Sequence, residues 1–231
     1  MLRDNIKILF EDEYFLVIDK PSGLVVNKSE TQKDPTNTLE DFLKDRLPEG
    51  LALDRSGIVH RLDKETSGVI LAAKSEETML SLQALFKSRE VKKEYAVVVI
   101  GEVKDDSFKI DAPIGRNPNK RTKYSVINGG KAAITDFDKV KQFEVEGAQY
   151  TYLIAHPLTG RTHQIRVHLA AYGHPVAADN LYSGVNNFER DIHIFGRLML
   201  HAKNIRFTHP VTGMAMDFDA PLPQEFQNYL L

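Results

Sequence analysis

The apolar residues of this chain fall into short runs of strand length, and these runs limit the fold more than any other feature. The clearest runs are residues 15–18, 68–73 and 94–100, each ended by a charged residue or a glycine. Segments with helical spacing are fewer and do not alternate regularly with the strands. The sequence therefore predicts an α+β fold and argues against a parallel sheet built from βαβ units.

Capping residues predict where the helices begin. Thr38 is placed to cap a short helix over residues 39–47, and Ser75 is placed to cap a second one. A third helix is expected over residues 163–172, with Thr162 as its cap and glycine and proline beyond its end. The apolar residues of that third segment also alternate, so a strand is the competing interpretation.

Length and composition indicate one domain. The 231 residues are 42% hydrophobic, enough to bury a full core, and no repeat or linker divides them, so we expect a single domain over residues 1–231. No run approaches the roughly 18 apolar residues of a membrane helix, and the first residues lack the apolar core of a signal peptide. We therefore expect a cytoplasmic protein. The absence of cysteine excludes disulfides and thiolate metal sites.

The net charge of −2 conceals an uneven distribution. Residues 1–54 carry 7 Lys and Arg against 12 Asp and Glu, residues 55–131 carry 15 against 10, and the remainder carry 8 against 10. The basic excess includes a polar, turn-rich stretch over residues 105–131, which predicts a hairpin with a mobile basic tip. Such runs are usually solvated surface, but Arg121 and Lys123 at this tip are also candidates for phosphate contacts.

A candidate carboxylate lies where polar and small residues crowd together between Gly57 and Gly68. There Asp63 stands two residues from Arg61, whose charge could keep a carboxylate ionised as a nucleophile or base. The structural alternative is that Asp63 stabilises a turn, as loop aspartates commonly do. The residues alone leave both interpretations open.

A second candidate site lies in residues 156–168, where cations gather at the expected helix start. Arg161, His163 and Arg166 could add side-chain donors to the backbone N–H groups that attract anions at a helix N-terminus. An arginine paired with a surface acid explains Arg166 equally well.

Metal and nucleotide-cofactor chemistry lack their usual motifs. His163 and His168 are five residues apart, not the four that place two ligands on one helical face, and no H-E-x-x-H string occurs. The chain also lacks a P-loop, a G-x-G-x-x-G turn and a G-x-S-x-G elbow. We therefore expect no metal and no cofactor.

Residues 60–68 read H-R-L-D-K-E-T-S-G, which resembles the H-R-L-D-x-x-T-S-G signature of the RluA-type pseudouridine synthase family. Asp63 occupies the position of the catalytic aspartate of that signature. Residues 160–168, G-R-T-H-Q-I-R-V-H, resemble a second family signature, and they are followed by the family's downstream Asp and Tyr at Asp179 and Tyr182. Shorter motifs at residues 20–23, 93–95 and 200–202 extend the resemblance over nearly the whole chain.

The resemblance implies a fold and a reaction. The family's fold is a mixed, largely antiparallel sheet with flanking helices and a central RNA-binding cleft, in agreement with the α+β prediction. The implied reaction isomerises specific uridines of transfer or ribosomal RNA to pseudouridine without a cofactor. RNA is then the expected partner, with Arg121 and Lys123 contacting it, and we expect a monomer that acts without a membrane or a metal.

The resemblance also implies individual roles. Asp63 would attack the sugar or the base of the target nucleoside, while Arg166 would pair with Asp63 and keep it ionised. Tyr95 would stack on the uracil and take part in the final proton removal. A uridine within folded RNA must first be extruded, and Arg61 is the candidate for the vacated space. Leu200 would pack against the extruded base.

Two departures from the family pattern bear on these expectations. Many members carry a small N-terminal RNA-binding domain, and too few residues precede Lys20 for one, so recognition is expected to depend on the catalytic domain. The family usually has a glycine before the aspartate that matches Asp179, whereas Ala177 and Ala178 stand here. We expect a local backbone change at this point without loss of chemistry.

Two other functions fit some of these sequence features. An RNA-folding factor would use the same basic surface to hold RNA, and it would not depend on Asp63. A carboxylate-based glycoside hydrolase would need a second acid near Asp63, for which Glu65 is the nearest candidate.

Overall fold

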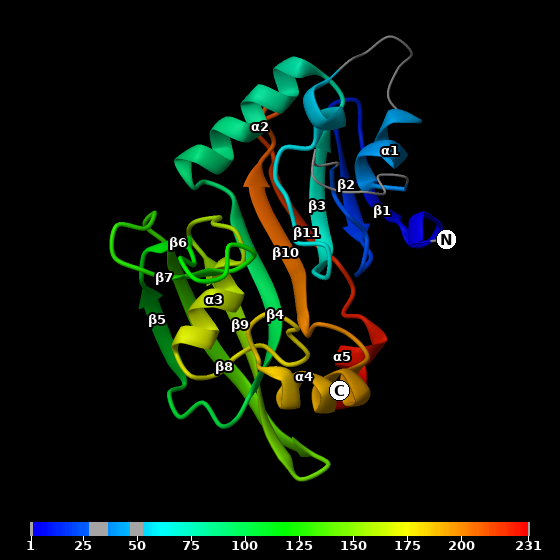
Figure 1. Cartoon of the computed structure of the whole chain (residues 1–231). Coiled ribbons are helices and arrows are strands. Elements are labelled where there is room, and N and C mark those ends of the chain that lie inside the picture. The colour runs from blue at the N-terminus through cyan, green and yellow to red at the C-terminus, as the bar shows by residue number, and fades with distance from the viewer. Residues whose placement is uncertain (1, 28–36, 47–52, 231) are drawn as a thin grey trace. The chain divides into compact units, whose positions relative to one another are not determined.

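The computed structural model describes residues 2–27, 37–46 and 53–230, whose contacts divide into two compact units (Figure 1). The first unit comprises Met1–Lys92 and Ala202–Pro221, and the second comprises Lys93–His201 and Leu222–Leu231. The chain thus passes from the first unit to the second, returns to the first unit for Ala202–Pro221, and ends in the second. The single domain expected over residues 1–231 stays a prediction, because the division into two contact units does not test it.

The first unit is built on an antiparallel meander. In β2 (Phe15–Lys20) the apolar run 15–18 is buried, and this strand pairs with β1 (Lys7–Glu11) and with β3 (Ser67–Ala73), all of whose residues are buried. Next to β3 comes β10 (Leu200–Thr208), which pairs with β11 (Ala215–Asp219). At Gly68 an added Cβ would lie 2.1 Å from the carbonyl oxygen of Ala202, so only glycine allows these two strands to approach so closely.

Short helices complete this unit, and their caps confirm two predictions. Thr38 accepts a hydrogen bond from the Asp41 amide at 3.1 Å at the start of α1 (Leu39–Lys44), and residue 47 of the predicted helix lies outside the described residues. Ser75 accepts one from the Thr78 amide at 3.2 Å at the start of α2 (Glu76–Ser88). Among the residues of this unit that the structure describes, Leu2–Asn5 forms the 3-10 helix η1 and Asp54–Gly57 forms η2.

The second unit holds an antiparallel sheet with the strand order β4-β9-β8-β5. A separate hairpin, β6-β7, lies in the basic stretch where the sequence predicts one, and the mobility of its tip stays a prediction. The strands of this unit are β4 (Lys92–Ile100), β5 (Ser107–Asp111), β6 (Ile114–Arg116), β7 (Tyr124–Val126), β8 (Ile134–Val145) and β9 (Ala148–Pro157).

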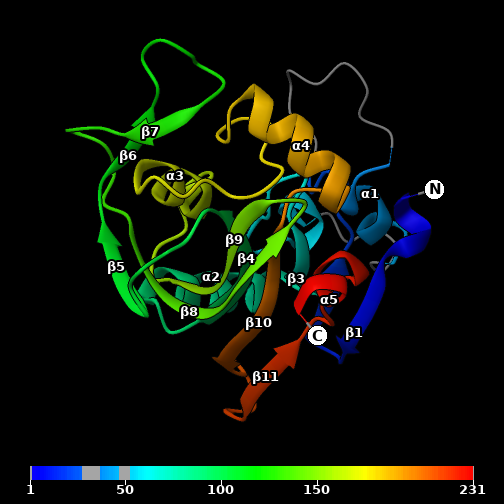
Figure 2. The same ribbon diagram turned by 90° about the horizontal axis from the view of Figure 1, so that it is seen from below.

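Three helices belong to this unit. The segment over 163–172 is helix α3 (Gln164–Ala171), which lies against the β8–β9 part of the sheet (Figure 2), so the competing strand interpretation is wrong. Thr162 is not its cap: His163 occupies that position at φ 55° and makes no capping hydrogen bond with its side chain. The C-terminal helix is α5 (Gln224–Leu230).

Helix α4 (Val185–Phe195) was not predicted. It lacks a capping side chain because Gly184 precedes it, and Gly196 ends it in the left-handed conformation. Its apolar residues at Phe188, Ile192 and Phe195 have helical spacing and were the available signal.

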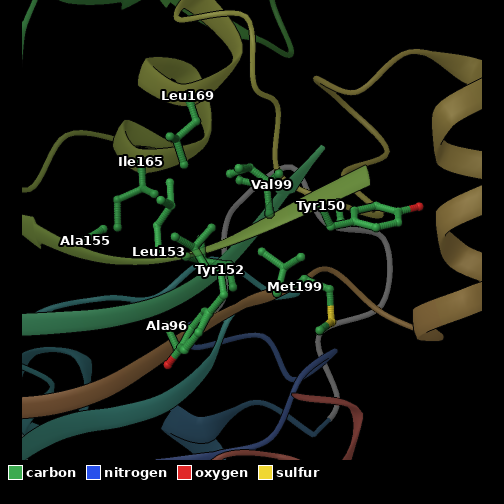
Figure 3. Packing of buried hydrophobic residues seen from close by; sticks show 14 of the residues in the cluster. Ala96, Val99, Tyr150, Tyr152, Leu153, Ala155, Ile165, Leu169 and Met199 are labelled. Carbon is green, nitrogen blue, oxygen red and sulfur yellow. The ribbon is translucent and has the colours of Figure 1, made fainter. Parts of the chain in front are cut away.

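The core of the second unit forms between the sheet and α3. Val99 and Leu153 of the sheet pack with Ile165 and Leu169 of α3 (Figure 3). A polar side chain is accommodated at the edge of this core, where the buried Tyr150 hydroxyl donates to Asp191 at 2.7 Å. Burial, together with this hydrogen bond, raises the pKa of Tyr150 far above its ordinary value. No helix in the described part of the chain is long and apolar enough to span a membrane.

Candidate functional site

Asp63 lies in the first unit, on the loop that joins η2 to β3, and its side chain is half-buried. The loop closes a turn in which the Thr66 amide donates to the Asp63 carbonyl oxygen at 3.1 Å. The preceding Leu62 is buried, whereas Arg61 is exposed. The loop therefore has an apolar anchor beside Asp63 and a cation at its surface.

The Lys20–Gly23 turn holds this loop through main-chain atoms. The wholly buried Lys20 ammonium donates to the Lys64 carbonyl at 3.1 Å and to the carbonyls of Pro21 and Leu24 at 2.9 Å each. The Gly23 amide donates to the same Lys64 carbonyl at 2.9 Å, and the Ser22 hydroxyl donates to the Glu65 carbonyl at 2.7 Å. Three contacts thus fix the two residues that follow Asp63.

His60 fixes the other end of the signature. Its Nε2 accepts a hydrogen bond from the Leu71 amide of β3 at 3.0 Å, which requires an unprotonated nitrogen at that position. Its ring stacks on Phe86 of α2, with ring centroids 4.6 Å apart. The histidine of the signature is therefore tied to both β3 and α2.

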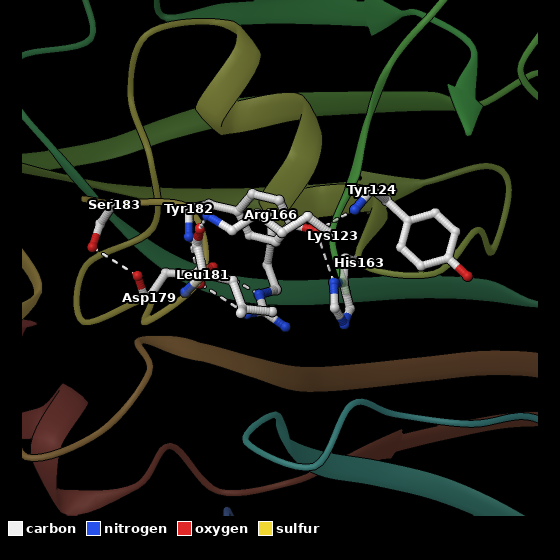
Figure 4. A network of polar contacts seen from close by, with 8 residues as sticks. All are labelled: Lys123, Tyr124, His163, Arg166, Asp179, Leu181, Tyr182 and Ser183. Atoms are coloured by element: carbon white, nitrogen blue, oxygen red, sulfur yellow. Dashed lines mark hydrogen bonds and ion pairs between the residues drawn. The ribbon is translucent and has the colours of Figure 1, made fainter. Parts of the chain in front are cut away.

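Arg166 lies in the second unit, on α3, and is almost completely buried. Its Nε donates to Asp179 Oδ2 at 2.7 Å and its Nη2 donates to Asp179 Oδ1 at 2.8 Å (Figure 4). This bidentate pair fixes the plane of the guanidinium group. The interpretation of Arg166 as half of a surface ion pair is wrong, because Asp179 is wholly buried.

The segment around Asp179 is itself shaped to hold that carboxylate. Asp179 Oδ1 also accepts from the amides of Leu181 and Tyr182, at 2.9 and 3.2 Å. Ala178 has φ 56°, the left-handed region that favours glycine, and its amide donates to Asp191 Oδ2 at 3.3 Å. The alanine that stands where the family has a glycine thus adopts the conformation open to glycine.

Tyr182 joins this segment to the β6-β7 hairpin. Its hydroxyl is hydrogen-bonded to His163 Nδ1 at 2.8 Å and accepts from the Tyr124 amide at 3.0 Å (Figure 4). The Lys123 ammonium donates to the Leu181 carbonyl. The Arg166 guanidinium lies 5.2 Å and the Lys123 ammonium 5.8 Å from the Tyr182 ring centroid, on the scale of cation–π contacts.

The other predicted site residues of the second unit lie on β4, on β10 and at the hairpin tip. Tyr95 is half-buried on β4, opposite Ala155 of β9, and Leu200 is buried at the start of β10. Arg121 is exposed at the hairpin tip. Asp63 and Arg61 belong to the first unit, so the pairing of Asp63 with Arg166 stays a prediction.

Sequence reasoning missed the structural roles of Asp179, Tyr182 and His163. Asp179 and Tyr182 were noted only as parts of a motif, and Asp179 is the residue that holds Arg166. The available signal was the position of Asp179, which is the first acidic residue after Arg166 and follows an apolar stretch. A buried arginine needs a carboxylate partner, so this acid was the candidate.

Burial lowers the pKa of two basic groups of the second unit, Lys93 and His168. It lowers the pKa of Lys93, two residues before Tyr95, to about 8. It also lowers the pKa of His168, although the Ala112 carbonyl and the charge of Asp111 act in the opposite direction. In residues 2–27, 37–46 and 53–230, no three His, Asp or Glu side chains gather as a set of metal ligands.

Comparison with known proteins gives consistent matches. A family model described as RNA pseudouridylate synthase matches residues 14–171. The chain is 37% identical over 230 residues to the ribosomal large subunit pseudouridine synthase D of Pseudomonas aeruginosa, covering 96% of this chain and 70% of that protein. It is 39% identical to the protein of the same name from Nitrosomonas europaea, covering 95% of this chain and 63% of that protein.

Solved structures give the same result. Human RNA pseudouridylate synthase domain containing 1 is similar with a TM-score of 0.78 and 28% identity, covering 98% of this chain and 89% of the human chain. Human RNA pseudouridylate synthase domain containing 4 shares the fold with a TM-score of 0.73 at 24% identity, covering 95% of this chain and 90% of the human chain. The predicted α+β fold with a mixed, largely antiparallel sheet is confirmed.

Proposed function

The chain belongs to the RNA pseudouridylate synthase family, and on that premise we propose that it isomerises uridines of ribosomal RNA through Asp63. The observation that carries the proposal is the H-R-L-D-K-E-T-S-G segment, which lies inside the matched residues 14–171 and contains a half-buried aspartate on a clamped loop. The large-subunit names of the similar bacterial proteins favour ribosomal over transfer RNA as the substrate. The enzyme works in the cytoplasm, as a monomer and without a cofactor.

The reaction detaches uracil from ribose carbon 1, turns it and rejoins it through carbon 5, so the leaving base must be retained. Asp63 serves as the covalent nucleophile, toward either the sugar or the base. Arg166 pairs with it and favours its ionised form in a site from which RNA excludes water. The ion pair with Asp179 uses two of the five N–H donors of Arg166, and its bidentate geometry gives the guanidinium group a fixed orientation within its own unit.

Tyr95 stacks on the extruded uracil and takes part in the removal of the carbon-5 proton. Arg61 enters the space that the base leaves, which its exposed position on the Asp63 loop allows. Leu200 packs against the base, and Arg121 and Lys123 contact phosphates on the RNA strand.

The test measures tritium release from a large-subunit ribosomal RNA transcript that carries tritium at uracil carbon 5. The Asp63→Ala variant is expected to lose activity by at least about 10³-fold, because no other group replaces the nucleophile. Asp54→Ala is the matched control, since Asp54 lies on η2 in the same unit and its contact with Arg55 is exposed. Circular dichroism must show that both variants are folded.

Three results separate the proposal from its alternatives. Full activity in Asp63→Ala would remove this residue from the mechanism. RNA binding without tritium release in the parent protein favours an RNA-folding factor. Release of free uracil in place of pseudouridine favours a glycoside hydrolase, with Glu65 as the second acid.

A further inference from the structure

A recess of about 560 Å³ opens at the base of the β6-β7 hairpin in the second unit. Its walls come from β6, from Tyr124 of β7, from the turn over residues 127–131 and from residues 160–162. This volume lies within the range of about 300 to 1,000 Å³ that is typical of small-molecule sites. It is therefore large enough for one nucleotide.

The lining of the recess carries positive charge without compensation. Arg116, Lys131 and Arg161 all line it, and no acidic residue does. Throughout the described part of the chain, none of these three cations forms an ion pair with a carboxylate. Three converging cations without a carboxylate indicate an anionic ligand, whereas an ordinary solvated surface carries mixed charges.

Two of these cations are held in place before any ligand arrives. The Arg161 Nε donates to the Ala132 carbonyl at 3.0 Å. The Arg116 Nη1 donates to the Arg121 carbonyl at 3.2 Å, and its guanidinium lies 5.6 Å from the ring centroid of Tyr124. Each guanidinium keeps further N–H donors in a fork that suits phosphate oxygens.

Two glycines of the recess lie where the backbone comes close to other atoms or faces open space. Gly130 cannot be replaced easily, because an added Cβ would lie 2.7 Å from the Ile114 carbonyl carbon. At Gly160 an added Cβ would meet nothing within 4 Å, so this position faces open space. The main chain at Gly160 can therefore approach a ligand without obstruction by a side chain.

We propose that this recess binds one nucleotide unit of the RNA substrate through its phosphate, which Arg116, Lys131 and Arg161 hold. The inference rests on the proposed function for the identity of the anion as RNA. The hydrogen bond between the Tyr182 hydroxyl and the Tyr124 amide connects a wall of the recess to the Arg166 network. Occupation of the recess would thus fix one point of the RNA strand on the same unit as Arg166.

The first experiment records amide spectra of the ¹⁵N-labelled protein during titration with uridine 5′-monophosphate, uridine and inorganic phosphate. The glycine amides of the recess are expected to shift with the monophosphate, less with phosphate and not with uridine. A Lys131→Gln and Arg161→Gln double variant should weaken monophosphate binding at least tenfold, while Lys104→Gln, an exposed lysine outside the recess, should not. Equal shifts with uridine and its monophosphate, or no shift in these amides, would overturn the proposal.

The second experiment measures binding of a large-subunit ribosomal RNA transcript at several salt concentrations. Each lost phosphate contact reduces the magnitude of the slope of log K against log salt by roughly 0.7 to 0.9, so the double variant, which weakens one phosphate contact, should lose up to one such step. An unchanged slope in a folded double variant contradicts RNA binding in the recess, and would leave it as a site for free nucleotides only.

The two proposals fail in different ways. Asp63→Ala should still bind monophosphate in the recess, because Asp63 is not one of its lining residues. If these amides shift with the monophosphate but the parent protein releases no tritium, the enzymatic function is contradicted and the recess proposal stands. If the parent protein releases tritium but these amides do not shift with the monophosphate, the recess proposal is contradicted and the enzymatic function stands.

Discussion

The segments that present Asp63 and Arg166 are held by different kinds of contact. The two residues that follow Asp63 are held through their own carbonyls, which accept from Lys20, Ser22 and Gly23 of one turn. Arg166 is held by the side chain of Asp179, and that carboxylate is held in turn by the amides of its own segment. Any residue supplies a carbonyl, but only an acid supplies a carboxylate, so the Arg166 segment should be far more sensitive to a change of side chain.

The largest effect is expected from Asp179→Ala. It leaves the almost fully buried Arg166 without its bidentate partner, which costs about 3 to 5 kcal/mol of unfolding free energy. Urea denaturation followed by circular dichroism measures this loss. Tritium release should fall as well, because the guanidinium loses its fixed orientation.

The matched control is Asp136→Asn in the same unit, which removes the exposed pair with Lys109 at 3.2 Å. An exposed pair contributes at most about 1 kcal/mol, so this variant should be nearly as stable as the parent protein. Equal losses in Asp179→Ala and Asp136→Asn would show that the buried pair has no special importance.

Lys20→Met is expected to cost less, about 2 to 3 kcal/mol. The substitution keeps the length and burial of the side chain but removes the donor to three carbonyls. Activity should fall more than stability predicts, since the Asp63 loop loses one of its anchors. Lys7→Met, at an exposed lysine of the neighbouring β1, is the control for the change in chemistry. If Lys20→Met keeps full activity in its folded state, the clamp does not position Asp63.

The difference between the two segments also determines how much of the site could be predicted from sequence. The α+β class, the caps at Thr38 and Ser75 and the basic hairpin follow from local patterns, because caps and apolar spacing act within a few residues. The bond between Arg166 and Asp179 spans 13 residues and depends on where the chain passes after α3, which no local pattern states. The cap of α3 was assigned wrongly because threonine is a common cap and His163 in a left-handed conformation is not.

A further test asks whether α3 depends on a neutral histidine at its buried face. His168 Nε2 lies 3.1 Å from the Ala112 carbonyl and Nδ1 lies 3.0 Å from the Thr135 hydroxyl, so we assign the proton to Nε2. Its pKa is below the ordinary value of 6.5 because of burial. The unfolded chain therefore takes up the proton more readily, and stability should fall as pH drops from 6.5 through the folded-state pKa.

Denaturation of the parent protein and of His168→Gln across this pH range measures the contribution. The variant cannot take up a proton at this position, so its stability should depend less steeply on pH below 6.5. Parallel curves for the two proteins would assign the acid sensitivity to other groups.

The smallest effect is expected from Lys64→Gln, next to Asp63. The Lys64 side chain forms only an exposed pair with Glu65 at 3.6 Å, which contributes less than about 0.5 kcal/mol. Its carbonyl, which accepts from Lys20 and Gly23, is unchanged by the substitution. Stability and tritium release should therefore stay close to those of the parent protein, measured beside Lys20→Met under the same conditions. A loss in Lys64→Gln as large as that in Lys20→Met would mean that the Lys64 side chain, and not the Lys64 carbonyl, holds the Asp63 loop.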